Sequence, residues 1–238
     1  MLDKTNLEQI KKVAKFLVDL DINIDKQYGF IVHHPFLKDP IVAVNDDKNP
    51  SGLRVLDINK KEDLKEMRDL YKKAINDCKD PYHIFLLLNR PYSGIFFMLI
   101  KEYLNIEDYT KILEDLWTNM EYPNADVNVK KKDWISLWKK ADLNLIYSEE
   151  DKKKLASLPD EFYVYRGLMK KAKKEALSWT LDKDRAIWFA KRFDNHGKVY
   201  RGKCRKEDIL VYLSCRGEEE IVVNYSKLKD VEEISYDE

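Results

Sequence analysis

Three groups of residues in the C-terminal third have side chains that could act together on a charged substrate. Arg166 lies in the run VYRG and offers a planar fork of hydrogen-bond donors, which suits phosphate oxygens. Ser178 and Thr180 flank a tryptophan, and Glu218 and Glu220 belong to the run RGEEEIVV. A carboxylate beside a sugar can stabilise the positive charge that develops when a glycosidic bond breaks. Such a set combines a group that can bind an anion with hydroxyls and carboxylates.

The predicted strands place each of these pairs on one side of the backbone. Residues two apart in an extended strand point the same way, so Ser178 and Thr180 share one side. Glu218 and Glu220 share a side for the same reason, and Glu219 points away. The aliphatic run after Glu220 is typical of a buried strand. We therefore expect a same-side carboxylate pair, with Glu219 the most expendable of the three glutamates.

From Glu161 onward the pattern is that of short strands with one helix among them. The helix is expected over KDRAIWFAKRF (183–193). The strands are expected over FYVYRGL (162–168), LSWT (177–180), GKVYRGKCR (197–205), DILVYL (208–213), EEIVVNY (219–225) and VEEISY (231–236).

The rest of the chain is mostly helical in its hydrophobic periodicity. We predict a mostly helical region over 1–120, with a β-hairpin at 28–45, and a second domain over 130–238. The fold class is α+β. Ser148 and Asp151, and Thr5 and Glu8, are spaced as capping boxes at helix starts.

Two tryptophans among lysines admit two readings. Trp134 and Trp138 lie four residues apart on one predicted helix face. Exposed, they could stack on nucleic-acid bases. We favour the interpretation that this helix is amphipathic and buries both tryptophans.

The composition argues against broad classes of partner. Of 238 residues, 43 are Lys or Arg and 43 are Asp or Glu, so the formal net charge is zero. A neutral chain has no general attraction to nucleic acid or to an anionic membrane. No apolar run is long enough to span a bilayer, and no secretory h-region is evident. We expect a cytoplasmic protein with no membrane partner, and leave open its delivery into another cell.

The cysteines are Cys78, Cys204 and Cys215, and no pair of them has metal-ligand spacing. We therefore expect neither a zinc site nor a disulfide framework.

The three motifs, in this order, resemble the mono-ADP-ribosyltransferases of the arginine–serine–glutamate class, including bacterial and phage-type members. The resemblance rests on VYRG, on LSWT followed by AIWFA, and on RGEEEIVV, and it covers about residues 162–225. The family's third motif reads E-x-E before aliphatic residues. Its serine motif is typically S-T-S, where this chain has Ser178-Trp179-Thr180. The resemblance implies a split β-sheet module that uses NAD as its substrate and needs no metal.

The resemblance also implies which residues hold NAD. Arg166, with Tyr165 and Gly167 beside it, would bind the pyrophosphate. Ser178 would bind the nicotinamide ribose and brace the catalytic glutamate, and Thr180 would support it. Trp179 is included in this cofactor-binding set, and the aromatic platform for nicotinamide is open among Trp179, Trp188, Phe189 and Phe193.

The remaining implied roles concern catalysis and the acceptor. Glu220 corresponds to the second glutamate of E-x-E, which stabilises the ribosyl cation. Glu218 corresponds to the first glutamate, which engages the acceptor. The segment before them corresponds to the acceptor-recognition loop, in which Tyr212 and Arg216 are candidates.

The expected function is transfer of ADP-ribose from NAD to a macromolecular acceptor. Protein arginine is favoured and nucleic acid stays open, in the setting of a bacterial or phage toxin, effector or defence protein. The alternatives are an NAD glycohydrolase, with water as the acceptor, and an inactive module that only binds a partner. The N-terminal region could recognise the substrate, dock an antitoxin or other regulatory partner, or complete the cofactor cleft.

Each motif alone also has an ordinary explanation. Arg166 could form a surface ion pair, and Ser178 and Thr180 could be strand or cap residues. Adjacent glutamates often mark a solvated strand edge. Only the joint occurrence of the motifs favours an active site.

Overall fold

The computed structural model describes residues 2–25, 31–120, 123, 126–169, 172–192 and 197–236, and the fold is α+β with a helical N-terminal region. The chain divides into two compact units, Met1–Ile112 and Leu113–Glu238. The division lies inside helix α5 (Ile106–Asn119), whereas the sequence predicts it after residue 120. The last turns of α5 therefore belong to the second unit.

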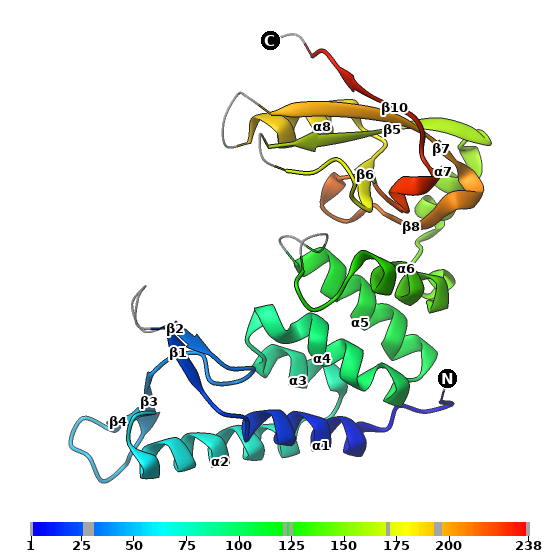
Figure 1. Cartoon of the computed structure of the whole chain (residues 1–238). Helices are drawn as coiled ribbons and strands as arrows, with labels where there is room; N and C mark the ends of the chain where they lie inside the picture. The colour runs from blue at the N-terminus through cyan, green and yellow to red at the C-terminus, as the bar shows by residue number, and fades with distance from the viewer. Residues whose placement is uncertain are drawn as a thin grey trace. The chain divides into compact units, whose positions relative to one another are not determined.

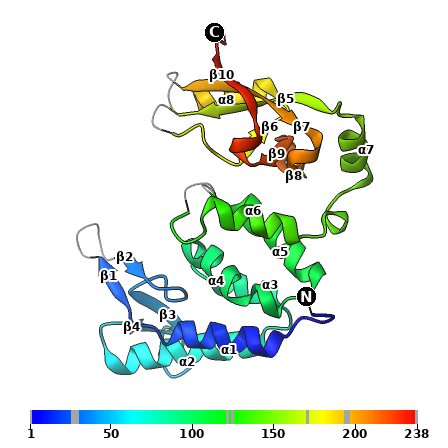
Figure 2. The same cartoon turned by 45° about the vertical axis from the view of Figure 1, so that its right-hand side comes forward.

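The first unit combines helices with two small antiparallel sheets, and α1 and α2 lie side by side in it (Figures 1 and 2). Met67 of α2 packs with buried side chains of β2 and β4. Before α5, the elements are α1 (Leu7–Val18), β1 (Asn23–Asp25), β2 (Ile31–His33), β3 (Ile41–Asn45), β4 (Leu53–Asp57), α2 (Lys61–Asp77), α3 (Pro81–Leu87), η1 (Arg90–Tyr92), α4 (Ser93–Ile100) and η2 (Lys101–Tyr103).

The predicted hairpin over 28–45 is wrong in its pairing. Both extended runs contain strands, but β2 pairs with β1, and β3 pairs with β4 from Ile41↔Asp57 to Asn45↔Leu53. The segment between β2 and β3 is buried instead of turning tightly, because Phe36 and Leu37 belong to the core. The turn-forming run DDKNPSG (46–52) closes the hairpin that does form. Residues 28–30 lie outside the described part of the chain.

The second unit contains a six-stranded antiparallel sheet in the order β10-β7-β5-β6-β9-β8. After α5, its elements are α6 (Lys131–Lys140), η4 (Leu143–Leu145), α7 (Glu149–Ser157), β5 (Glu161–Leu168), β6 (Ser178–Thr180), α8 (Lys183–Lys191), β7 (Lys198–Arg205), η5 (Lys206–Asp208), β8 (Ile209–Leu213), η6 (Cys215–Gly217), β9 (Glu220–Val223), η7 (Tyr225–Lys227) and β10 (Lys229–Ile234).

This sheet is nearly split in two. Strands β5 and β7 pair over eight residues, and β6 and β9 pair over three. Between these halves, β5 and β6 pair only through Tyr165 and Thr180. The two halves of the sheet are therefore joined only at the Tyr165–Thr180 pair. Arg166 is the next residue of β5 after this pair.

One helix-capping prediction is confirmed and one is wrong. Ser148 and Asp151 cap α7 reciprocally, with backbone-to-side-chain distances of 3.1 and 2.9 Å. In α1 the cap is Asn6, a residue type that caps at least as well as threonine. Thr5 donates its hydroxyl to Asp108 of α5 instead.

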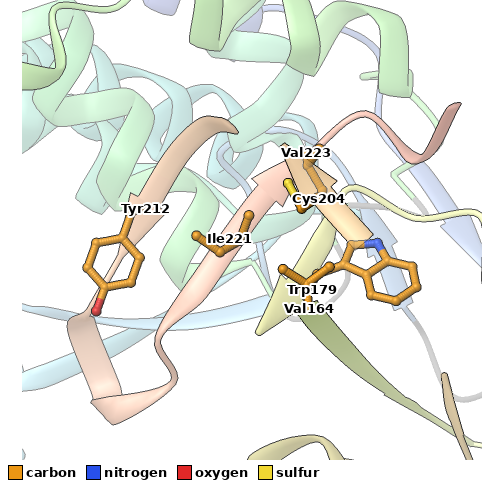
Figure 3. Packing of buried hydrophobic residues seen from close by; sticks show 6 residues of the cluster. All are labelled: Val164, Trp179, Cys204, Tyr212, Ile221 and Val223. Atoms are coloured by element: carbon orange, nitrogen blue, oxygen red, sulfur yellow. The ribbon is translucent and has the colours of Figure 1, made fainter. Parts of the chain in front are cut away.

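A hydrophobic core cluster of the second unit is formed by side chains from β5, β6, β7, β8 and β9 (Figure 3). Within this cluster, Trp179 alternates with Ser178 and Thr180 along β6. Its buried members are Val164, Trp179, Cys204, Tyr212, Ile221 and Val223.

Helix α8 packs closely on β5 through small residues. Ala186 and Ala190 are fully buried in a cluster with Val199, and Tyr165 packs against it. A Cβ placed at Gly167 would lie 1.8 Å from the Ala186 carbonyl oxygen. Only glycine allows this backbone approach, so Gly167 fixes the helix next to the strand that carries Arg166. Among the described residues, no helix is long and apolar enough to cross a membrane.

Candidate active site

Glu220 begins β9 and pairs across the sheet with Thr180 of β6. The indole nitrogen of Trp117 lies 3.2 and 3.3 Å from its two carboxylate oxygens. The Ser178 hydroxyl is hydrogen-bonded to the same carboxylate. This carboxylate is therefore held by donors from α5 and β6.

Burial raises the pKa of the Glu220 carboxyl above its ordinary value. The hydrogen bonds from Ser178 and Trp117 lower the pKa, the negative charge of Glu218 raises it, and the positive charge of Arg166 lowers it. The net effect is a raised pKa, so burial dominates. Chemistry that needs the ionised carboxylate is accordingly lost as the pH falls through this raised pKa.

Arg166 presents a partly satisfied guanidinium beside this carboxylate. One terminal nitrogen donates to the Ser178 carbonyl oxygen. Its buried Nε has no hydrogen-bond partner among the described residues. Burial lowers the pKa of Arg166 to about 10, and the charge of Glu220 opposes this shift. The group is still a cation at neutral pH, with a donor left over for an anionic ligand.

The two hydroxyls of the serine motif serve different glutamates. Ser178 contacts Glu220, as described above. The Thr180 hydroxyl donates to the Glu218 carbonyl oxygen at 2.6 Å and accepts from the Asp182 backbone N–H at 3.0 Å. Asp182 caps α8. Buried Thr180 therefore ties the loop that carries Glu218 to the start of α8.

The predicted strand alternation of the glutamates is wrong, because β9 starts only at Glu220. Glu218 has helical backbone angles at the end of η6, and Glu219 has a left-handed φ of 42°. Glu218 forms an ion pair with Arg185 at 3.2 Å, and Glu219 forms one with Lys154 at 2.6 Å. The different cationic or hydrogen-bonding partners of the three carboxylates offset their mutual repulsion, although the charge of Glu218 still raises the pKa of Glu220.

We predict that glycine at position 219 relieves backbone strain and that alanine at the same position does not. A non-glycine residue at this φ costs about 1 kcal/mol, and the partly exposed ion pair with Lys154 contributes about 0 to 1 kcal/mol. Glu219→Gly loses the pair but relieves the strain, whereas Glu219→Ala only loses the pair. In urea denaturation, the free energy of unfolding of Glu219→Gly should be about 1 kcal/mol higher than that of Glu219→Ala. A more stable alanine variant would contradict the strained backbone.

Two predicted ligand contacts are contradicted by burial (Figure 3). Trp179 is 2% exposed, donates its indole N–H to the Ala176 carbonyl and stacks on Tyr225. It points opposite to its two neighbours because it sits between them in a strand. Tyr212 is 4% exposed and belongs to β8, not to an acceptor loop. Burial raises the pKa of Tyr212 to about 12.

Three other predicted residues have different outcomes. Tyr165 and Gly167 pack against α8, so the structure gives them the role of positioning Arg166 between them. The backbone of Arg216 lies in η6, but its side chain is outside the described part of the structure. Of the candidate platform residues, Trp188 is exposed, and Phe193 is outside the described residues.

Trp117 is the site residue that motif reasoning missed. Its ring is buried against Trp134 and Trp138, with centroid distances of 5.2 and 6.1 Å, both edge-to-face. The expected burial of these two tryptophans is confirmed. In the sequence, Trp117 looks only like one more apolar residue on a helix face. Nothing nearby indicates that its N–H faces a carboxylate 103 residues further on.

We predict that Trp117→Phe moves the acid limb of activity to higher pH. The change removes a donor to the ionised form of Glu220, so the pKa of Glu220 rises further. At neutral pH we expect about a tenfold loss of turnover, the scale of a hydrogen bond to a charged group. Trp138→Phe is the matched control, because the Trp138 indole nitrogen has no partner among the described residues. An identical pH profile in both variants would sink the proposed role of the Trp117 N–H.

Among the described residues, no group of His, Cys, Asp or Glu could hold a metal ion. A cavity of about 410 Å³ in the first unit is lined by none of the predicted site residues. Comparison with known proteins finds no matching family model, no matching curated protein and no matching solved structure.

Proposed function

We propose that the second unit is an NAD-dependent mono-ADP-ribosyltransferase. The single observation that carries this proposal is the set of groups around the Glu220 carboxylate. Ser178 and Trp117 donate to it, and the cation Arg166 lies close enough to lower its pKa. A resemblance of three short motifs predicts that Arg166, Ser178 and Glu220 come together, and the fold brings them together.

The arrangement suits cleavage of the bond between ribose and nicotinamide. The unsatisfied Nε of Arg166 and its buried charge fit the pyrophosphate of NAD. Glu220, held rigidly, would stabilise the positive charge that develops on the ribose. Nicotinamide leaves as a neutral molecule with the bonding electron pair. The acceptor nitrogen or oxygen then bonds to the ribose carbon and gives up one proton to Glu218 or to solvent.

An NAD glycohydrolase is the second candidate, and the ion pair of Glu218 is compatible with it. Glu218 would address a macromolecular acceptor, yet it is engaged by Arg185 at 3.2 Å. Water needs no such carboxylate and could accept the ribosyl group without displacing this pair. Both reactions need Arg166, Ser178 and Glu220.

A stoichiometric measurement separates the two reactions. The protein is incubated with NAD labelled in its adenine, with and without cell lysate. Transfer predicts that nicotinamide release rises with lysate and that an equal amount of label becomes bound to protein or RNA. Release that is unchanged by lysate, with label only in free ADP-ribose, would instead establish hydrolysis. The class of labelled macromolecule would decide between protein arginine and nucleic acid.

We further propose that the enzyme serves as an intracellular toxin, effector or defence protein. The support is the resemblance alone. The first unit, with its own core around Met67, is then the candidate for recognising an acceptor or a regulatory partner such as an antitoxin.

A further inference from the structure

Glu218 already binds a guanidinium group of its own chain. The Arg185 terminal nitrogen lies 3.2 Å from a Glu218 carboxylate oxygen, and the two side chains are 28% and 26% exposed. Arg185 is in the first turn of α8, and Thr180 links this helix start to the Glu218 loop. The hydrogen bonds of Thr180 therefore position the contact between Arg185 and Glu218 next to the candidate active site.

An aromatic shelf completes the environment of this guanidinium. The Arg185 guanidinium carbon lies 4.7 Å from the ring centre of Trp188 and 5.5 Å from that of Phe189. Trp188 is 47% exposed, so its ring is reachable from solvent. A carboxylate beside an aromatic face is the combination that binds a planar guanidinium through charge, hydrogen bonds and stacking. The site is therefore built for an arginine side chain.

We infer that Arg185 occupies the acceptor position of Glu218, and that an acceptor arginine must displace it to be modified. This inference rests on the proposed transferase function and deepens it, because it names a residue of this chain that competes with the acceptor. An acceptor guanidinium can displace Arg185 from Glu218, because this ion pair is partly exposed and partly exposed ion pairs contribute little free energy. Arg185 then lowers the apparent affinity for acceptors without touching the reacting ribose, so it determines specificity and is not a catalytic residue.

The test compares Arg185→Gln with wild type, using butylguanidine as the acceptor and labelled NAD as the donor. Removing the competing guanidinium should lower KM for butylguanidine about three- to tenfold, the combined scale of the ion pair and the stacking contact. The KM for NAD is measured alongside, so that an effect on the acceptor is separated from an effect on NAD. Gln keeps good helix propensity, and a melting curve checks the fold.

Arg192→Gln is the matched control, because Arg192 lies 5.5 Å from the same Trp188 ring. It should leave KM for butylguanidine unchanged. Suppose that wild type releases nicotinamide and that wild type and Arg185→Gln have the same KM for butylguanidine. This result would overturn the inference and leave the proposed function standing. A higher KM in Arg185→Gln would also overturn it, by making Arg185 part of the acceptor site. Intact NAD with every variant would overturn the inference together with the proposed function.

Discussion

Glu220→Gln should reduce NAD turnover by about a hundredfold or more. The substitution keeps the shape of the side chain and removes the charge that would stabilise the ribosyl cation, which is the scale of losing one electrostatic stabiliser. Ser178 and Trp117 would still face the side chain, so the geometry is preserved. Nicotinamide release under saturating NAD measures the effect. Glu219→Gln is the matched control, since that carboxylate faces Lys154, and it should retain activity within about twofold.

The same variant should be at least as stable as wild type at neutral pH. Because burial raises the pKa of Glu220 in the folded state, the folded protein binds its proton more tightly than the unfolded chain does. Wild-type stability therefore falls as the pH rises from the ordinary glutamate pKa, about 4.3, through the raised one. Gln removes this penalty, so the stability gain should be larger at pH 8 than near pH 5. An inactive variant that also melts earlier would point to misfolding instead of lost chemistry.

Gly167→Ala should unfold or strongly destabilise the second unit. The added Cβ would lie 1.8 Å from the Ala186 carbonyl oxygen and 2.8 Å from the Ala190 nitrogen, both backbone atoms of α8. The helix must move away from β5, at a cost of about 3 kcal/mol or more. We expect Tm to fall by about 10 °C. Strand propensity alone predicts the opposite sign, because alanine is favoured over glycine by about 0.5–1 kcal/mol.

The chain contains a matched control for this prediction. The sequence YRG occurs again in β7, where a Cβ at Gly202 would meet a Val231 methyl group at 3.1 Å. A side-chain methyl can yield where a backbone carbonyl cannot, so Gly202→Ala should shift Tm by only about 2 °C. Equal melting points for the two alanine variants would contradict the role given to the contact between α8 and β5.

The local patterns predicted the elements well, because they depend on near neighbours. Short runs of strand-forming residues identified every described strand of the second unit, and spacing alone identified the Ser148–Asp151 cap. The hairpin failed because pairing between strands depends on which loop can turn, and buried Phe36 and Leu37 hold the first loop open.

Only the residues of the candidate site that belong to the three sequence motifs could be predicted from the sequence. Arg166, Ser178 and Glu220 are together as expected, but the alternation that was to orient Glu218 fails at the left-handed backbone of Glu219. Trp117 could not be found, because its hydrogen bond joins residues 103 positions apart. Long-range contacts of this kind follow from packing, which periodicity does not encode.

The most direct test of the central claim is the fate of labelled NAD in lysate with wild type and Glu220→Gln, compared at equal concentration. We predict that wild type releases nicotinamide and places the adenine label on a macromolecule, and that the variant does neither at a measurable rate. Intact NAD with wild type, or equal labelling by both proteins, would contradict the account.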